Sequence, residues 1–219
     1  NARWAVVDVP ADVPVLLVDG SPEATDARFL GAALAPGGPA RTGIRPRIET
    51  PRHLSLEPLA AYDAIYLANV DRLDESAVES LQQYVSDGGG LAVFLGPRSS
   101  GATINEQLYR DGRGLLPMPV VAPSELRVDR VESLPDLDVG THPIFRVLSG
   151  RKNSFLSAVN VQRYFSVPED WRAEPDSGVE VIARLRNGAP LAVERSLGKG
   201  RVVAFTTTAA PTWNNWAAN

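Results

Sequence analysis

The polar residues best placed for chemistry follow predicted strands. Asp19 and Gly20 end an apolar run, Asn69 lies at the end of a second run, and Gly96 follows a third. In open α/β sheets, ligands and catalytic groups gather at the carboxyl ends of the strands. Asp19 could bind a cation or accept a hydrogen bond from a substrate hydroxyl. It could equally form the turn that starts the next helix, which is the interpretation we favour, and Asn69 has the same two interpretations.

A hydrolytic triad is the second candidate chemistry. His142 could in principle act with Ser99 or Ser100 and with Asp19, because a nucleophile, a base and an orienting acid are the parts required. The sequence has no Gly-x-Ser-x-Gly elbow, however, and Pro97 lacks a backbone N–H that an oxyanion hole would use. A histidine before a proline more often closes a turn. We therefore predict no catalytic residue, and keep His142 as a candidate ligand-binding residue.

Thiol and metal chemistry have little support. The chain contains no cysteine, which excludes disulfides, thiolate catalysis and cysteine-ligated metals. Its two histidines are His53 and His142, and no second histidine or paired carboxylates lie near His53 in the sequence. We predict no metal site and no cofactor.

Trp213 and Trp216 form an aromatic cluster near the end of the chain. They could stack on a sugar or a base, but the interpretation we favour is packing against a neighbouring domain of a longer parent protein. Our hypothesis is that they pack on the domain and help to cover a pocket bounded by Asp19 and Asn69. We therefore add Trp213 to the candidate site.

Bulk properties restrict the possible partners. The chain has 219 residues, of which 44% are hydrophobic and 22% charged, and a formal net charge of −4. That balance is typical of a globular protein and gives no electrostatic footprint for nucleic acid. No run approaches the roughly 20 apolar residues needed to span a bilayer.

Because the first residues look like part of a strand, we expect residues 1–12 to be a remnant strand or linker of a preceding domain. Residues 13–219 are expected to form a single domain.

The first half alternates strands and helices. Residues 13–19 and 91–95 are apolar runs typical of central parallel strands, as is 62–70. Asp74 can cap a helix that extends to Asp87, where three glycines follow. The remaining expected elements are a helix over 24–35, a Gly/Pro loop over 36–46 and a strand over 47–54.

The second half is richer in strands. We expect a short helix over 104–109 and strands over 159–167, 179–185, 191–195 and 202–208, with a hairpin turn at Asn187-Gly188. The last strand is expected to return to the main sheet. The predicted fold class is α/β: a flavodoxin-like three-layer sandwich with a mostly parallel sheet and a β-rich C-terminal elaboration.

Several of these segments together resemble the class I glutamine amidotransferase-like superfamily. They are VLLVDG at 15–20, YDAIYLANV at 62–70, YVSDGGG at 84–90, THPIF at 141–145, and PLAVE at 190–194 with GKGRV at 198–202. The chain is most similar to non-catalytic branches, such as β-galactosidase trimerisation-type and ThuA-like domains. It is also similar to C-terminal regions of large membrane-anchored bacterial proteins that carry a von Willebrand A domain.

The resemblance implies a fold without its usual chemistry. Active amidotransferases of the superfamily need a cysteine at a strand-to-helix elbow, and this sequence has none, so no catalytic residue is carried over. We expect a non-enzymatic interaction or ligand-sensing module of a larger envelope-associated bacterial protein. Its partners would be other domains of that parent, other proteins or a small ligand. The alternative is a hydrolase or sugar-modifying enzyme of ThuA-like type that uses Asp19, His142 and a serine.

Overall fold

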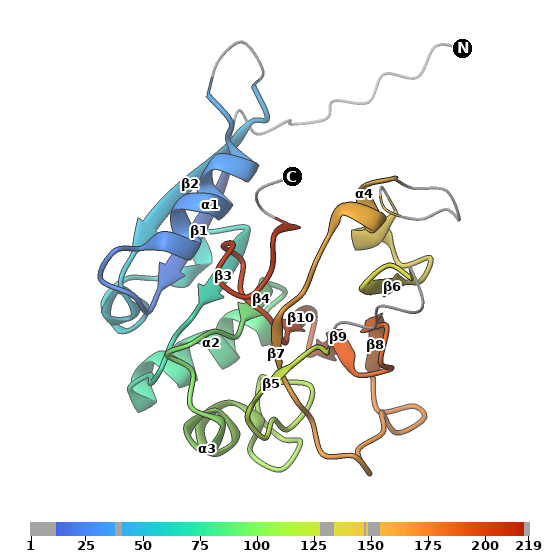
Figure 1. Ribbon diagram of the computed structural model, residues 1–219. Coiled ribbons are helices and arrows are strands. Elements are labelled where there is room, and N and C mark those ends of the chain that lie inside the picture. The colour runs from blue at the N-terminus through green and yellow to red at the C-terminus, as the bar shows by residue number, and fades with distance from the viewer. Residues whose placement is uncertain (1–11, 38–40, 128–133, 147, 149–153, 217–219) are drawn as a thin grey trace, which may run out of the picture.

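The computed structural model describes residues 12–37, 41–127, 134–146, 148 and 154–216, to which the structural statements below refer (Figure 1). The predicted remnant strand therefore lies outside the described residues, apart from Asp12.

One mixed sheet of eight strands organises the chain, in the order β2-β1-β3-β4-β10-β9-β8-β6. The first five strands in this order are mutually parallel, whereas β9, β8 and β6 each run antiparallel to the preceding neighbour. The predicted return of the last strand to the main sheet is confirmed, because β10 pairs with β4 in parallel. The strands are β1 (Val13–Asp19), β2 (Ile44–Glu49), β3 (Ala64–Ala68), β4 (Gly90–Phe94), β6 (Leu137–Val139), β8 (Val179–Leu185), β9 (Pro190–Leu197) and β10 (Gly200–Phe205).

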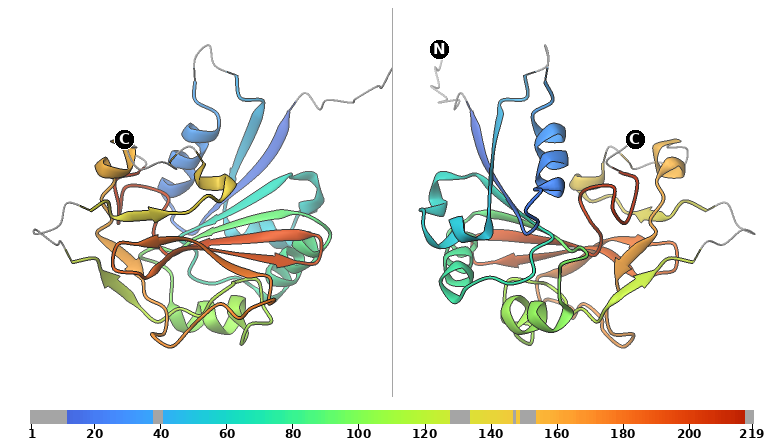
Figure 2. Two further views of the ribbon diagram at one scale, coloured as in Figure 1. Left: turned by 90° about the vertical axis from the view of Figure 1, so that its right-hand side faces the viewer. Right: turned by 60° about the vertical axis from the view of Figure 1, so that its left-hand side comes forward.

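Helices cover the two faces of this sheet, which confirms the three-layer architecture (Figures 1 and 2). The α-helices are α1 (Thr25–Leu34), α2 (Glu75–Ser86), α3 (Gly101–Ile104) and α4 (Ser154–Ala158). A π-helical turn, Asn105–Tyr109, continues α3, and 3₁₀ turns occupy Pro51–Ser55, Leu59–Ala61 and Pro143–Phe145.

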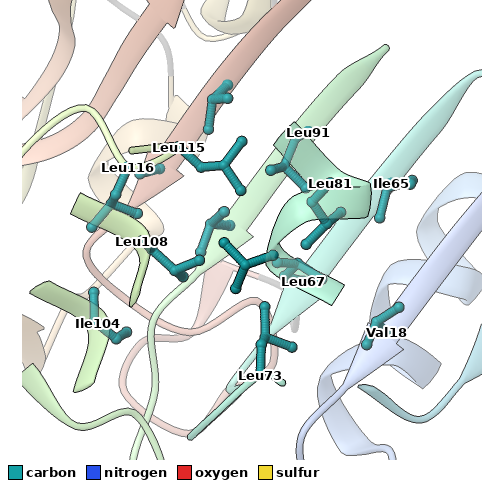
Figure 3. Packing of buried hydrophobic residues seen from close by; sticks show 14 of the residues in the cluster. Val18, Ile65, Leu67, Leu73, Leu81, Leu91, Ile104, Leu108, Leu115 and Leu116 are labelled. Carbon is teal, nitrogen blue, oxygen red and sulfur yellow. The ribbon is translucent and has the colours of Figure 1, made fainter. Parts of the chain in front are cut away.

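Alternation along β1 shows why both faces need cover. Val15 and Leu17 pack with Ala27 of α1, whereas Leu16 and Val18 join the core cluster that includes α2. Successive side chains of a strand point to opposite faces, so an unbroken apolar run is buried only when both faces are covered. Figure 3 shows the α2 side of this core, where Leu81 of α2 lies beside Ile65, Leu67 and Leu91 of the sheet.

The helix α2 begins and ends where its sequence predicts. The Asp74 carboxylate accepts a hydrogen bond of 2.7 Å from the Ala77 N–H, which satisfies one free donor of the first turn. The chain leaves the helix through Gly88, whose φ of 125° lies in a region that favours glycine.

The strand predicted over 47–54 is wrong in position. β2 begins earlier, at Ile44, inside the segment predicted as a loop, and Pro51–Ser55 forms a 3₁₀ turn. Pro51 stands in the first turn of this helix, where a missing N–H costs nothing. Pro46 lies within β2, which is an edge strand and therefore tolerates a proline.

The second half forms the β-rich elaboration. The β8–β9 hairpin confirms the turn predicted at Asn187-Gly188. The strand expected over 159–167 is shorter: only β7 (Arg163–Phe165) forms, and it pairs with β5 (Pro123–Glu125) in a separate two-stranded ribbon. On its other side β7 bonds the segment after β10, since the Phe165 N–H donates to the Thr206 carbonyl at 2.7 Å.

Candidate functional site

The parallel strands bring their carboxyl ends together at one edge of the sheet. The N–H of Gly20 donates to the Ala68 carbonyl at 2.9 Å, and the N–H of Asn69 donates to the Phe94 carbonyl at 2.9 Å. The turns after β1, β3 and β4 are therefore in direct contact. This is the edge at which the sequence predicted a site.

Asn69 occupies the space between two of these turns. A Cβ on Gly20 would lie 2.2 Å from the Asn69 carbonyl oxygen, and a Cβ on Gly96 would lie 2.6 Å from Asn69 Oδ1. Asn69 itself has a φ of 54°, a left-handed conformation that asparagine tolerates better than most residues. Its Oδ1 accepts a hydrogen bond of 2.8 Å from the Arg98 N–H, so the side chain clamps the turn after β4.

Asp19 forms the turn that starts α1. It is 2% exposed, and its Oδ1 accepts from the Ser21 N–H at 2.8 Å while Oδ2 accepts from the Ala27 N–H at 2.9 Å. Both carboxylate oxygens are thus used by backbone donors of the same turn and helix. This geometry matches the structural interpretation that the sequence favoured.

The serines after β4 also serve the backbone. Ser99 is buried, accepts a hydrogen bond from the Gly96 N–H at 3.1 Å and donates to the Val70 carbonyl at 3.3 Å. Ser100 caps α3 through the Thr103 N–H at 3.4 Å. Among the described residues, neither hydroxyl has a histidine as a hydrogen-bond partner.

His142 lies in the loop after β6, where it precedes the 3₁₀ turn Pro143–Phe145. Its Nδ1 accepts from the Ile144 N–H at 3.4 Å, and its Nε2 lies 3.2 Å from Glu194 Oε2 on β9. A neutral imidazole whose Nδ1 accepts carries its proton on Nε2, so Nε2 is the donor to Glu194. The other Glu194 oxygen lies 3.2 Å from an Arg201 guanidinium nitrogen. The structure therefore assigns His142 to a His–Glu–Arg group.

Asp19 and this group are far apart. Strands β3, β4 and β10 separate β1, which carries Asp19, from β9, which carries Glu194. The two strands are therefore four interstrand spacings apart across the sheet, about 19 Å. The structure brings together Asp19, Gly20, Asn69 and Gly96 at the strand ends and leaves His142 outside.

Trp213 belongs to the segment that follows β10. It is 4% exposed, and its ring centroid lies 5.8 Å from that of Phe165. The preceding Thr206, Thr207 and Thr208 have no exposed surface. Trp213 thus packs into the domain, as our hypothesis required, while the cover that it would provide over Asp19 and Asn69 stays a prediction.

The sequence did not predict the contacts of two acidic side chains, Asp26 and Glu194. Asp26 is 2% exposed, and its Oδ1 accepts from the Ala210 N–H at 2.8 Å. Burial raises the pKa of Asp26 above its usual value, the hydrogen bond from Ala210 opposes the rise, and the charge of Asp19 adds to it. No sequence pattern around Asp26 indicates that it is buried and paired. For Glu194 such a pattern exists, because an acidic residue within an apolar strand such as β9 is expected to have a partner.

Within the described residues there is neither a candidate metal site nor a helix that could span a membrane. Histidine, aspartate and glutamate side chains in this part of the chain form no group of three or more that could hold a metal ion. None of its helices combines the length and apolar character that crossing a bilayer requires.

Comparison with known proteins identifies the fold. No protein-family model matches the chain, and no curated protein matches its sequence significantly. A cytoplasmic protein from Salmonella typhimurium LT2 has a similar structure, with a TM-score of 0.57, 19% identity, and coverage of 92% of this chain and 90% of that one. A ThuA-like protein from Bacteroides uniformis ATCC 8492 matches with a TM-score of 0.50, 12% identity, and coverage of 97% and 88%.

The fold also occurs within larger chains. An exo-β-1,4-mannosidase from Opitutaceae bacterium strain TAV5 matches with a TM-score of 0.51 and 14% identity, over 90% of this chain but 31% of the mannosidase. Together these similarities show that the chain shares the overall α/β fold of these proteins.

Proposed function

We propose that this chain is a non-catalytic interaction or ligand-sensing module of a larger protein. One observation carries the proposal: Asn69 fills the strand-end edge where this fold class places ligands. Its backbone and side chain contact Gly20 and Gly96, and its Oδ1 is bonded to the Arg98 N–H. A substrate at this point would have to displace Asn69.

The available nucleophiles support the same proposal. Glutamine hydrolysis in this superfamily needs a thiolate, and the chain has no cysteine. Ser99 is the buried hydroxyl at the turn after β4, but its proton is directed at the Val70 carbonyl rather than at a base. An unactivated hydroxyl is a weak nucleophile.

The alternative is a hydrolase that uses Asp19, His142 and a serine. It requires the three groups within hydrogen-bond reach of one another. The separation of about 19 Å between β1 and β9 opposes that arrangement. Both ring nitrogens of His142 are also engaged, with Ile144 and Glu194.

Membership of a larger protein rests on two supports. The resemblance to domains of large membrane-anchored proteins suggests it, and the mannosidase match illustrates such a use of the fold, since the matched part is 31% of that chain. Envelope association of the parent rests on the resemblance alone. Fractionation of cells that express the full gene product tests it, and recovery of that product in the cytosol alone would refute it.

A direct test of the absence of catalysis uses the purified chain. Ammonia release from glutamine and hydrolysis of p-nitrophenyl acetate and p-nitrophenyl glycosides should equal the rate in buffer. The variants Ser99→Ala and His142→Ala serve as matched controls. A heat-sensitive rate that either variant abolishes would overturn the proposal and establish the enzyme alternative.

A further inference from the structure

The edge of the main sheet at β8 is only partly paired. β8 spans Val179–Leu185, but its outer neighbour β6 pairs only with Ala183, Arg184 and Leu185. Among the described residues, the first half of β8 therefore has β9 on one side and no strand on the other. Figure 2 (left) views the sheet from this edge.

The alternation of hydrogen bonds along β8 identifies the backbone groups at this edge. The N–H of Ser196 on β9 donates to the Gly178 carbonyl at 3.0 Å. In an antiparallel pair, residues whose N–H and C=O groups bond the partner strand alternate with residues whose groups point away from it. Gly178 and Glu180 therefore face β9, whereas Val179 and Val181 present their N–H and C=O groups at the open edge.

Three of these four backbone groups have no partner in the described part of the chain. The Val179 N–H donates to Ser177 Oγ at 3.3 Å, whereas the Val179 carbonyl and both groups of Val181 make no hydrogen bond there. Groups on one edge of a strand repeat every two residues, about 6.6 Å. An extended polypeptide presents donors and acceptors at this same repeat, while a helix uses its own backbone groups internally and a sugar lacks the repeat. The edge thus suits an added strand.

The opposite edge of the sheet is closed to such pairing. The Gly43 carbonyl, which precedes β2, accepts from the Val13 N–H at 2.7 Å, so by the same alternation Pro46 points its backbone outward. Proline has no N–H to offer, and an edge proline is a common device against strand addition. Residues 179–181 include no proline or lysine, and the irregular register of β8 with β9 begins only after Val181.

The two faces of the β8 edge differ in chemistry. Val179 and Val181 lie on the α2 side of the sheet, where they pack against the same core as Trp171. Glu180 lies on the other side, is exposed, and is paired in register with Glu194 on β9. The Glu194 carboxylate has its own partners, described above, whereas Glu180 has no ion pair among the described residues.

We infer that the β8 edge binds an extended segment of a partner protein by strand addition. The segment has apolar residues opposite Val179 and Val181 and a lysine or arginine opposite Glu180. Side chains that are opposite each other on neighbouring strands share a face, so the apolar ones extend the α2-side core and the basic one meets the free carboxylate. Main-chain hydrogen bonds supply the affinity of this mode and side chains the specificity. The inference rests on the proposed function, because it names the partner class of the interaction module.

The test uses the peptide acetyl-Thr-Val-Lys-Val-Thr-amide, which carries this pattern, and a control peptide with glutamate in place of the lysine. Titration of the ¹⁵N-labelled chain with the lysine peptide should shift the backbone N–H signal of Val181 and slow its hydrogen exchange, because this N–H gains an acceptor. Val181→Pro removes the donor at an edge position that tolerates proline, and should weaken binding about tenfold.

A charge reversal tests the side-chain pattern. The lysine peptide should bind about two- to fivefold more tightly than the glutamate peptide, the range expected for one cross-strand ion pair. Glu180→Lys should reverse this preference. Glu79→Lys is the matched control, because it makes the same charge change on the exposed face of α2 and should leave the preference as it was.

Each outcome decides the inference. Binding of neither peptide, binding that leaves the Val181 signal in place, or an unreversed preference in Glu180→Lys would each overturn it. Protection of the Val181 N–H that grows with protein concentration without peptide would make a second copy of the chain the occupant and would also overturn it. If Val181→Pro does not fold, the exchange rate of Val181 and the Glu180→Lys reversal still decide.

The two proposals fail separately. Turnover in the assays of glutamine, ester and glycoside hydrolysis would refute the non-catalytic function and leave peptide binding at β8 intact. Loss of peptide binding would refute the strand addition and leave the absence of catalysis intact.

Discussion

Asp26 and Ala210, which are 184 residues apart in the sequence, are joined by a hydrogen bond of 2.8 Å from the Ala210 N–H to Asp26 Oδ1. The bond connects the first turn of α1 to the segment after β10. Both residues are buried, so two segments that are far apart in the sequence share a contact that water does not reach.

The charge of Asp26 should lower stability at neutral pH. Because burial raises the pKa of Asp26 above its unfolded-state value of 3.8, the folded state binds a proton more readily than the unfolded state. The free energy of unfolding should therefore fall as the pH rises from about 3.8 through the folded pKa. Asp26→Asn keeps the acceptor and removes the charge, so its melting temperature at pH 7 should equal or exceed that of the parent. The difference should shrink in acid.

Asp26→Ala is the companion variant. It leaves the buried Ala210 N–H without a partner and should cost about 1–3 kcal/mol. Thermal unfolding between pH 4 and 8 measures both variants. If Asp26→Asn destabilises the protein as much as Asp26→Ala, the buried charge of Asp26 does not lower the stability at neutral pH.

Asp74 should show the opposite pH dependence. Its hydrogen bonds from the Ala77 N–H and the Ser76 hydroxyl lower the pKa of its carboxyl. The stabilisation is present above the unfolded value of 3.8 and is lost as the pH falls through the folded pKa. Asp74→Ala should cost about 0.5–2 kcal/mol at pH 7, whereas Asp74→Asn, also a good cap, should cost less. Urea denaturation at pH 7 and at pH 3 checks this, and an equal loss at both values would contradict it.

Gly96→Ala should destabilise the strand-end turns, because the new Cβ would lie 2.6 Å from Asn69 Oδ1. We expect a loss of about 1–3 kcal/mol. Asn69→Gly removes the opposing side chain and suits the φ of 54°, so the double variant should lose less than the sum of the single losses. Gly140→Ala is the control, since a Cβ there meets nothing within 4 Å. Strict additivity would mean that Asn69 does not fill this space.

Trp213→Ala should lower the free energy of unfolding by about 3–5 kcal/mol, the usual cost of truncating a buried aromatic residue. Its 4% exposure and its packing on Phe165 are the reason. Chemical denaturation measures the loss. An unchanged midpoint would show that the ring is exposed in solution and available to a partner.

Local pattern alone determined much of the fold. The apolar run of β1 was predicted with its exact bounds, and so was β8, because an unbroken or alternating apolar pattern depends only on neighbouring residues. The Asp74 cap and the glycine stop of α2 are equally local signals. The position of β2 was predicted wrongly because a proline such as Pro46 indicates a loop, and only the sheet order shows that this strand lies at an edge, where proline is tolerated.

The candidate site depended on the tertiary structure. The sequence by itself excluded thiol chemistry and placed Asp19, Asn69 and Gly96 at strand ends, since composition and strand order suffice for both. It could not show that Asn69 fills the space between two turns, that His142 pairs with Glu194, or that Asp26 meets Ala210. Those partners lie far along the chain, and which donor meets which acceptor is decided only when the sheet order brings the segments together.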